Sequence, residues 1–319
     1  MKIIFINRYF YPDHSATSQI LTDLAFFLAG QGREVHIITS RQRYDDPAAR
    51  LAAVDVVGQV QVHRVWTSRF GRAGLLGRTF DYLSFYLSAG WRAWRLSRRD
   101  DLLVSKTDPP LASMLGAWVA RRRGARLVNW LQDLFPEVAV ALNVRGMAGR
   151  VGQFLQRRRN ASLHTAAINV VIGERMAQRL RAEGIPERQL CVIHNWADGD
   201  AIQPVAAATN PLRREWGLEG RFVIGYSGNM GRAHEFETLL NAMASLSIEQ
   251  NPLAPPIVFL FIGGGHQREH LQAEAQRRGI TNVQFRAYQP RERLRESLGV
   301  ADVHVISLRP ELEGIDRAE

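Results

Sequence analysis

The chain has 319 residues and a formal net charge of +10, and its 46% hydrophobic and 23% charged residues are typical of globular proteins. This length suits two domains of ordinary size. The single cysteine, Cys191, excludes a disulfide framework and a cysteine-based metal site, and no apolar run approaches the length that spans a bilayer. The opening apolar run is too short and too interrupted for a signal peptide, which predicts a cytoplasmic protein.

Apolar runs of strand length alternate with helical stretches along the first part of the chain. The run at 2–7 is followed by the loop RYFYPDHSATS and by an amphipathic helix from about Ser18 to Gln31, which ends at Gly32. The same pattern predicts further strands at 34–39, 102–105, 127–130, 167–172 and 191–193. The stretch 201–211, AIQPVAAATNP, has two prolines and weak periodicity, so it is predicted to be a linker.

The segment 222–240, FVIGYSGNMGRAHEFETLL, is the most informative part of the chain. An apolar run meets a loop that contains Gly228 and Gly231, and a helical pattern follows. This predicts a helix that starts with bare N–H groups and the positive end of its dipole, an arrangement that receives a phosphate or pyrophosphate. Arg232 adds a guanidinium that can fork onto phosphate oxygens.

The second half continues with strands expected at 257–262, 283–285 and 303–306. Strands that alternate with helices predict parallel sheets covered on both faces. Two such series predict two Rossmann-like domains, 1–195 and 196–319, on either side of a cleft. Ligands of open α/β sheets bind beyond the carboxyl ends of the strands, so the cleft is the expected site.

The positive charge is confined to the first domain. Residues 1–195 carry 28 Lys plus Arg against 15 Asp plus Glu, whereas residues 196–319 carry 13 against 16. Positive charge on one side predicts an anionic partner, either nucleic acid or anionic lipid. The arginine runs at 121–123 and 157–159 are interpreted as solvated helix faces.

Residues 69–98 favour lipid over nucleic acid. The loop RFGRAGLLGR mixes apolar side chains with arginine, and its membrane-facing candidates are Phe70, Arg72, Leu75 and Leu76. Apolar wedges beside arginine suit the headgroup boundary of a membrane. The aromatic helical stretch at 79–98 fits either a membrane surface or a core helix whose arginines lie at its C-terminal dipole end.

Several motifs resemble a known family: YSGNMG at 226–231, HNWAD at 194–198 and SLRPELEG at 307–314, with YPDHSATSQ at 11–19 and WLQDLFPE at 130–137. The chain is similar over essentially its whole length to the family-4 retaining glycosyltransferases of the α/β GT-B fold. Within them it resembles the bacterial surface-polysaccharide subgroup that includes N-acetylfucosamine and colanic-acid glycosyltransferases.

Together with the loop from Phe70 to Leu76 and the basic first domain, the resemblance predicts a peripheral enzyme on the cytoplasmic face of the membrane. It would transfer a sugar from a UDP- or GDP-linked donor, with retention, to a polyprenyl-diphosphate-linked glycan during polysaccharide or lipopolysaccharide biosynthesis. No metal cofactor and no nucleic acid partner are expected. The family's second glutamate and its closing helices would lie beyond Glu319, so the second domain is expected to be truncated. Without these elements, this chain is expected to bind the nucleotide more readily than it turns over the substrate.

On the donor side, the resemblance places the nucleotide sugar against three loops and one glutamate. These residues are Gly228, Asn229, Gly231, Arg232, Gly263, Gly264, Gly265, Ala287, Tyr288 and Glu313. Arg232 would stabilise the leaving diphosphate and Glu313 the transferred sugar, and both are therefore catalytic candidates. The alternatives are tight turns for the glycines, a half-buried ring for Tyr288, and Glu311 as the rival of Glu313.

On the acceptor side, the candidates are His14, Ser15 and Thr17 in the first loop, and Asp133. Thr17 or Ser18 would alternatively cap the following helix. Gln132 stands where many relatives have histidine and cannot act as a base. The catalytic proton acceptor is therefore expected to be Asp133, Glu137 or the departing phosphate.

Two other functions remain open from the residues alone. A nucleotide-sugar epimerase of the same fold would use the donor pocket but needs additional acid–base carboxylates, and it would release free epimerised sugar without an acceptor. A catalytically silent remnant that binds nucleotides or other anions is the second alternative. A remnant that binds only nucleic acid or lipid would ignore UDP and GDP.

Overall fold

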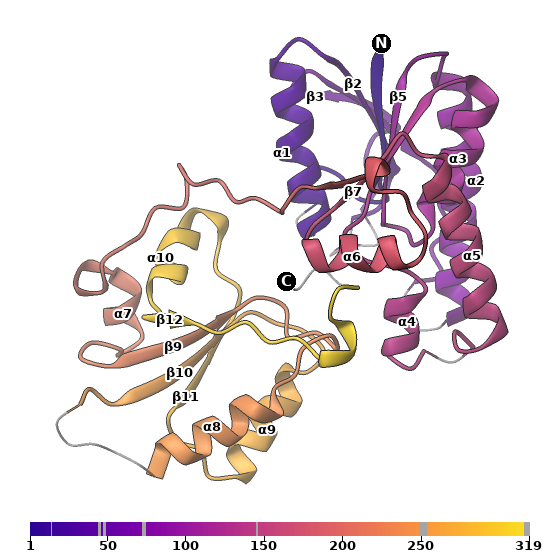
Figure 1. Cartoon of the computed structure of the whole chain (residues 1–319). Coiled ribbons are helices and arrows are strands. Elements are labelled where there is room, and N and C mark those ends of the chain that lie inside the picture. The colour runs from indigo at the N-terminus through magenta and orange to yellow at the C-terminus, as the bar shows by residue number, and fades with distance from the viewer. Residues whose placement is uncertain are drawn as a thin grey trace. The chain divides into compact units, whose positions relative to one another are not determined.

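The computed structural model describes residues 1–13, 15–43, 46, 49–71, 75–144, 146–248 and 254–315. The chain divides into two compact units (Figure 1). Unit 1 consists of Met1–Trp196 together with Gly314 and Ile315, and unit 2 consists of Ala197–Glu313. Each unit has its own sheet, as expected for two separate α/β domains.

The sheet of unit 1 has eight strands in the order β3-β4-β2-β1-β5-β6-β7-β8. Their bounds are β1 Lys2–Ile6, β2 Glu34–Ser40, β3 Val54–Val57, β4 Val60–Val65, β5 Leu102–Lys106, β6 Arg126–Trp130, β7 Ile168–Val171 and β8 Leu190–Val192. All neighbours are parallel except β3 and β4. In the central register, Phe5 pairs with Ile37 on one side and Val104 on the other.

Helices cover both faces of this sheet. They are α1 Ala16–Gly30, α2 Leu75–Leu96, α3 Ala112–Arg123, α4 Glu137–Ala141, α5 Arg150–Thr165 and α6 Glu174–Ala182, with the short helix η1 Glu187–Gln189. Because side chains alternate along β1, Phe5 packs on the α1 face and Ile6 on the opposite face, against Phe85 of α2. No helix in the described residues is long and apolar enough to cross a membrane.

The hairpin β3–β4 was missed from the sequence, although every apolar run predicted to be a strand is one. Its residues, VDVVGQVQVHRV, alternate between apolar and polar rather than forming an apolar run. Gly58 and Gln59 form the turn with φ of 55° and 66°, which matches the turn type that joins two-residue hairpins. The alternation and the glycine were the available signals.

Unit 2 has a four-stranded parallel sheet in the order β11-β10-β9-β12. The strands are β9 Phe222–Ser227, β10 Ile257–Ile262, β11 Val283–Arg286 and β12 Val303–His304. The helices are α7 Pro211–Glu215, α8 Glu237–Ile248, α9 Arg268–Arg277 and α10 Leu294–Gly299, with the short helices η2 Ala207–Thr209, η3 Arg291–Arg293 and η4 Pro310–Leu312. Apolar clusters lie on both faces, one around Leu240 of α8 and the other around Leu212 of α7.

A buried histidine pair joins β2 and β4 in unit 1. The rings of His36 and His63 stack with centroids 5.2 Å apart, and Nδ1 of His36 lies 2.9 Å from Nε2 of His63. Arg92 donates to Nδ1 of His63 over 2.7 Å. Burial, together with the positive charge of Arg92 and the interaction with His36, lowers the pKa of His63 from 6.5 to about 4.

Unit 1 is therefore expected to lose stability as the pH falls from about 6.5 towards 4. In this interval the unfolded chain protonates His63 and the folded chain does not, so the unfolded state binds more protons. We expect a loss of about 1–2 kcal/mol at pH 5 relative to pH 7.5 from this group. Urea unfolding of the parent and of His63→Asn at both pH values measures it. Equal pH dependence in the two proteins would contradict the assignment.

Candidate functional site

The sheet of unit 2 reverses its direction of growth between β9 and β12. Strands β9, β10 and β11 follow one another across the sheet, and the chain then returns to add β12 on the free side of β9. The loop after β9, residues 228–236, therefore lies next to the loop after β12, residues 305–309. Ligands of open parallel sheets bind beyond the carboxyl ends of the strands at such a reversal.

Hydrogen bonds tie these two loops together. Nδ1 of His234 donates to the carbonyl oxygen of Ser307 over 2.5 Å, and the N–H of Glu235 donates to Oγ of Ser307 over 2.9 Å. The N–H of Arg309 donates to the carbonyl oxygen of Ala233 over 2.9 Å. Because a carbonyl oxygen only accepts, Nδ1 of His234 carries its hydrogen.

The loop after β10 is joined to the loop after β9 in the same way. The N–H of Met230 donates to the carbonyl oxygen of Gly264 over 2.7 Å. Gly263 and Gly265 have φ of +138° and +130°, and a Cβ at Gly263 would lie 2.0 Å from the carbonyl oxygen of Gly228. Packing between the two loops thus already requires glycine at these positions, without any nucleotide.

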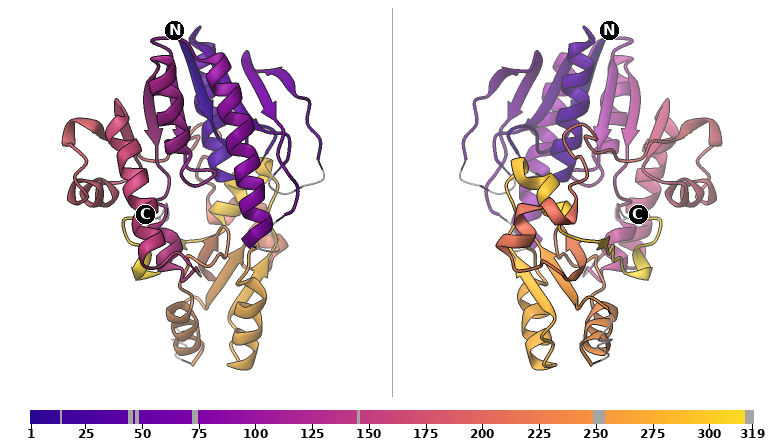
Figure 2. Two further views of the ribbon diagram at one scale, coloured as in Figure 1. Left: turned by 90° about the vertical axis from the view of Figure 1, so that its right-hand side faces the viewer. Right: turned by 90° about the vertical axis from the view of Figure 1, so that its left-hand side faces the viewer.

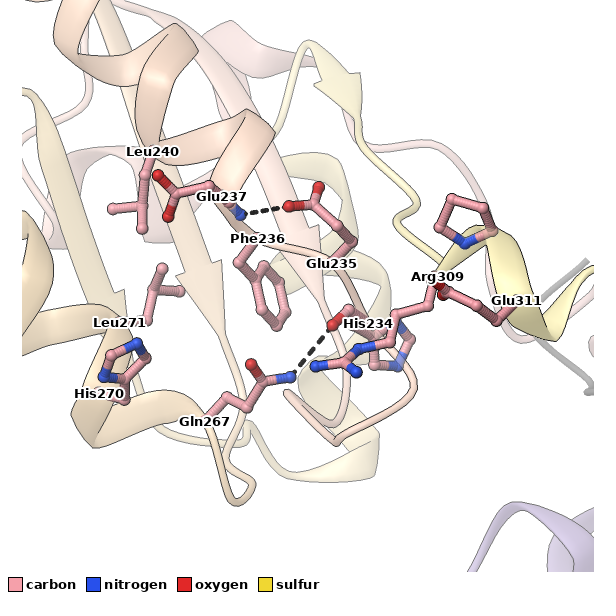
Figure 3. Close-up of a pocket in the computed structure, with 11 residues that line it drawn as sticks. His234, Glu235, Phe236, Glu237, Leu240, Gln267, His270, Leu271, Arg309 and Glu311 are labelled. Atoms are coloured by element: carbon pink, nitrogen blue, oxygen red, sulfur yellow. Dashed lines mark hydrogen bonds between the residues drawn. The ribbon is translucent and has the colours of Figure 1, made fainter. Parts of the chain in front are cut away.

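A cavity of about 280 Å³ opens beside these loops (Figure 3). Its lining residues are His234, Glu235, Phe236, Glu237, Leu240, Gln267, His270, Leu271, Arg309, Pro310 and Glu311. The side chains of Arg309 and Gln267 approach one another near His234. Carboxylates, an amide and a guanidinium beside apolar walls suit a small ring that carries many hydroxyl groups.

The start of α8 differs from the sequence prediction. The helix begins at Glu237 rather than at the glycine loop, and its first N–H groups are not bare. The carboxylate of Glu235 accepts from the N–H of Glu237 over 2.6 Å and from that of Thr238 over 3.1 Å. An anion in this place must therefore use other donors than the start of α8.

Such donors lie in the neighbouring loops. In the part of the chain that the structure describes, the N–H groups of Gly264 and Gly265 donate no hydrogen bond. Arg232 is exposed, and its Nη2 lies 3.2 Å from Nε2 of His266, which holds the guanidinium beside the β10 loop. The structure thus brings the predicted glycine loops and Arg232 together at adjacent strand ends.

The remaining predicted donor residues lie close by, with two differences. Tyr288 is 59% exposed rather than half-buried, because its ring lies outside the loop at Gly264 instead of in the core. Ala287 beside it is exposed. Glu311 lines the cavity whereas Glu313 does not, because the turn of η4 buries Leu312 between them. Which of the two glutamates contacts the transferred sugar stays a prediction.

Sequence reasoning missed six polar residues that line the cavity. These are His234, Glu235, Glu237, Gln267, His270 and Arg309. His234 and Glu235 lie in the segment that was singled out, and Arg309 lies in SLRPELEG. The available signal was the position of these residues after the carboxyl ends of β9, β10 and β12.

Unit 1 has a comparable reversal between β1 and β5. The N–H of Arg8, just after β1, donates to the carbonyl oxygen of Asp108, just after β5, over 2.7 Å. In the predicted acceptor loop, Oδ1 of Asp13 accepts from the N–H of Ser15 over 2.8 Å. His14 lies outside the described residues.

The start of α1 corrects the capping prediction. The helix begins at Ala16, and Ser15 occupies the cap position without a side-chain cap bond. Thr17 and Ser18 are therefore inside the first turn and buried, so neither caps the helix. The acceptor roles of Ser15 and Thr17 stay predictions.

Asp133 follows β6 and lines a small cavity of about 10 Å³ together with Lys106 and Arg159. Lys106 is buried, and its Nζ lies 3.5 Å from the ring centroid of Trp130. Glu137, the other predicted proton acceptor, is buried in an ion pair with Arg159 at 2.5 Å. The ion pair holds one oxygen of this carboxylate, and the identity of the proton acceptor stays a prediction.

The predicted membrane loop lies partly outside the described residues, and its candidate Arg72 is one of the residues outside them. Phe70 and Leu76 are 68% and 78% exposed, and Leu75 is the first residue of α2. The exposure agrees with the expectation for both flanks of the loop. Contact with a membrane stays a prediction.

Comparison with known proteins assigns the chain to a family. Residues 16–196 match the family described as Glycosyl transferase 4-like domain, and residues 209–319 match Glycosyl transferases group 1. The chain belongs to this family of glycosyltransferases. The predicted family is thereby confirmed, whereas retention and the polysaccharide subgroup stay predictions.

Three relatives illustrate the match. The glycosyltransferase is 25% identical over 321 residues to WcaI of Escherichia coli (strain K12), a glycosyl transferase named for colanic acid biosynthesis, with 96% of this chain and 76% of WcaI covered. Sucrose-phosphate synthase from Thermosynechococcus elongatus has a TM-score of 0.70 at 17% identity, over 96% of this chain and 76% of that one.

Anabaena HepE, solved in complex with UDP-glucose, has a TM-score of 0.65 at 17% identity, over 98% of this chain and 75% of that one. These structures confirm the predicted two-domain α/β GT-B fold.

Proposed function

We propose that this glycosyltransferase moves a sugar, with retention, from a UDP- or GDP-linked donor to a polyprenyl-diphosphate-linked glycan. The product would enter a bacterial surface polysaccharide or lipopolysaccharide. The observation that carries the proposal is the cavity at the strand reversal of unit 2, whose lining residues His234 and Gln267 come from the two loops that also carry the glycines and Arg232. Transfer would occur on the cytoplasmic face of the membrane, with the loop from Phe70 to Leu76 against the lipid.

The donor would be held in two parts. Its diphosphate would accept hydrogen bonds from the N–H groups of Gly264 and Gly265 and from Arg232. Negative charge grows on the diphosphate as the glycosidic bond breaks, so donors already aimed at it lower the barrier. The complex of HepE with UDP-glucose supports a nucleotide sugar on this fold.

The sugar itself would occupy the cavity. Glu311 would accept hydrogen bonds from its hydroxyl groups, and Arg309 and Gln267 would donate to them. A carboxylate near the ring also stabilises the positive charge that develops on the sugar as the bond breaks. A ring held between fixed donors and acceptors is oriented for the transfer.

The acceptor would approach on the side from which the diphosphate leaves, which preserves the configuration of the sugar. A diphosphate oxygen would take the acceptor proton, and Asp133 is the side chain proposed to assist. The net positive charge of unit 1 supports an anionic, lipid-linked acceptor. The similarity to WcaI supports a role in polysaccharide assembly.

A thermal-shift screen of UDP-, GDP- and TDP-sugars, followed by calorimetry, tests the donor. We expect one nucleotide sugar to raise the melting temperature, because a ligand that binds only the folded state stabilises it. Ribose 5-phosphate is the control for binding of a simple anion in this screen.

Proton NMR of the product reports its anomeric configuration. An inverted product would reject the mechanism, and equal use of water-soluble oligosaccharides would reject the acceptor class. Free epimerised sugar without acceptor would indicate an epimerase, and indifference to UDP and GDP would reject the donor site.

A further inference from the structure

Helix α2 has two apolar faces, only one of which lies in the core. Phe85, Ala89 and Ala93 are fully buried against the sheet. On the opposite side, every exposed side chain between Phe80 and Trp91 is a large hydrophobic one. These are Phe80, Leu83, Leu87 and Trp91, which are 57%, 51%, 77% and 59% exposed.

This outer stripe occupies positions where a surface helix normally carries charged or polar residues. The spacing of three to four residues aligns the side chains along one line of the helix. Leu76, which is 78% exposed, extends the line towards the start of α2. The sequence left open whether this helix belongs to the core or to a membrane surface, and the structure shows one apolar face in the core and a second one exposed.

The neighbouring helices repeat one motif on the same side of the sheet. Helix α3 contacts both α2 and α5, and the left view of Figure 2 turns this layer towards the viewer. Each of the three helices carries an exposed aromatic ring with an arginine four residues later stacked over it. The pairs, with guanidinium-to-centroid distances, are Trp91–Arg95 at 5.6 Å, Trp118–Arg122 at 5.7 Å and Phe154–Arg158 at 5.2 Å.

The charge of this layer has one sign. Helices α2, α3 and α5 together contain ten arginines, seven of which are exposed, and a single carboxylate, Asp81. Asp81 is 3% exposed and accepts hydrogen bonds from Oγ of Ser68 and from the N–H groups of Phe70 and Gly71. The outward side of the layer thus combines apolar rings with unbalanced positive charge.

We propose that the outer face of α2, α3 and α5 docks on the surface of an anionic phospholipid bilayer. The stripe of α2 would enter the boundary between headgroups and acyl chains, and the stacked arginines would meet lipid phosphates. Aromatic rings and arginine stems favour that boundary because each has an apolar body and a polar end. This face goes beyond the loop at 70–76 and deepens the proposed function, on whose membrane location it rests.

The charge also argues against a second copy of the chain as the occupant. Two such faces brought together would oppose arginine with arginine, with no exposed carboxylate on the three helices to compensate. An anionic bilayer satisfies both properties of the face, because it buries the rings and neutralises the arginines.

Co-sedimentation of the full chain with vesicles tests the proposal. We expect the chain to bind vesicles of phosphatidylcholine with phosphatidylglycerol at least about tenfold more tightly than vesicles of phosphatidylcholine alone, and added salt to weaken the binding. The double variant Leu87→Asp/Trp91→Asp is expected to lose at least about tenfold in affinity, because it places two charges in the stripe. Phe27→Asp, at a 63% exposed position of α1 on the opposite face of the sheet, is the matched control and should bind as the parent does.

A second variant separates the contribution of the arginines to vesicle binding from that of the apolar stripe, and it also tells a loss of binding from misfolding. Arg95→Gln/Arg122→Gln/Arg158→Gln keeps the stripe and should weaken binding to the anionic vesicles only. Equal binding by the parent and the double variant would overturn the proposal, as would equal binding to both vesicle types. A parent dimer that Leu87→Asp converts to a monomer, with vesicle binding unchanged, would identify a protein interface instead. None of these measurements needs donor or acceptor, so they can fail while sugar transfer holds.

Discussion

Replacing Arg232 with alanine is expected to slow sugar transfer by about 10²–10³-fold, which corresponds to a loss of ~2.7–4 kcal/mol of transition-state stabilisation. The guanidinium belongs to the β9 loop, and its Nη2 lies 3.2 Å from Nε2 of His266 in the β10 loop. No lysine occurs in residues 196–319 to replace its charge. Its effect on folding should be small, because the side chain is exposed.

The measurement is kcat/KM for the variant, together with calorimetry of UDP and GDP. We expect nucleotide affinity to fall by about tenfold or more, since a hydrogen bond to a charged group contributes ~1.5–3 kcal/mol. Arg295→Ala, at an exposed arginine of α10, is the control for a general loss of positive charge from unit 2. If Arg232→Ala binds both nucleotides as tightly as the parent, the diphosphate assignment is wrong.

The glycine loops were predictable because their signal is local. A strand followed by Gly228 and Gly231 indicates a turn at a strand end, and the structure has it there. The start of α8 was not predictable in this way. Residues 232–236 are drawn towards Ser307 by the hydrogen bonds of His234 and Glu235, contacts between residues more than 70 positions apart. Helix periodicity carries no information on such a contact.

The cavity shows the same limit. The motif SLRPELEG was recognised, but the choice between Glu311 and Glu313 depends on how η4 turns and on Leu312, which it buries. Alternating residues around a short turn look equivalent in a sequence. The topological reversal between β9 and β12, which explains why Arg309 reaches the cavity, follows only from the strand order.

The arginine run at 157–159 was interpreted as a solvated face, and this is wrong for one member. Arg157 and Arg158 are exposed, whereas Arg159 is 3% exposed. Its Nη2 lies 2.5 Å from Oε1 of Glu137 and 2.8 Å from Oε2 of Glu183. Successive residues of a helix point in different directions, so a run of three like charges must turn one of them inwards when the helix packs.

Arg159→Leu is therefore expected to destabilise unit 1 by about 3–5 kcal/mol, because it leaves the buried carboxylate of Glu137 without its cation. Arg157→Leu in the same helix is the matched control and should change the free energy of unfolding by less than about 0.5 kcal/mol. Urea unfolding of both variants measures the difference. The double variant Arg159→Leu/Glu137→Leu should recover much of the loss, since replacing a whole buried pair by apolar side chains is often neutral. A loss in Arg159→Leu no larger than in Arg157→Leu would show that the ion pair does not hold α4 and α5 together.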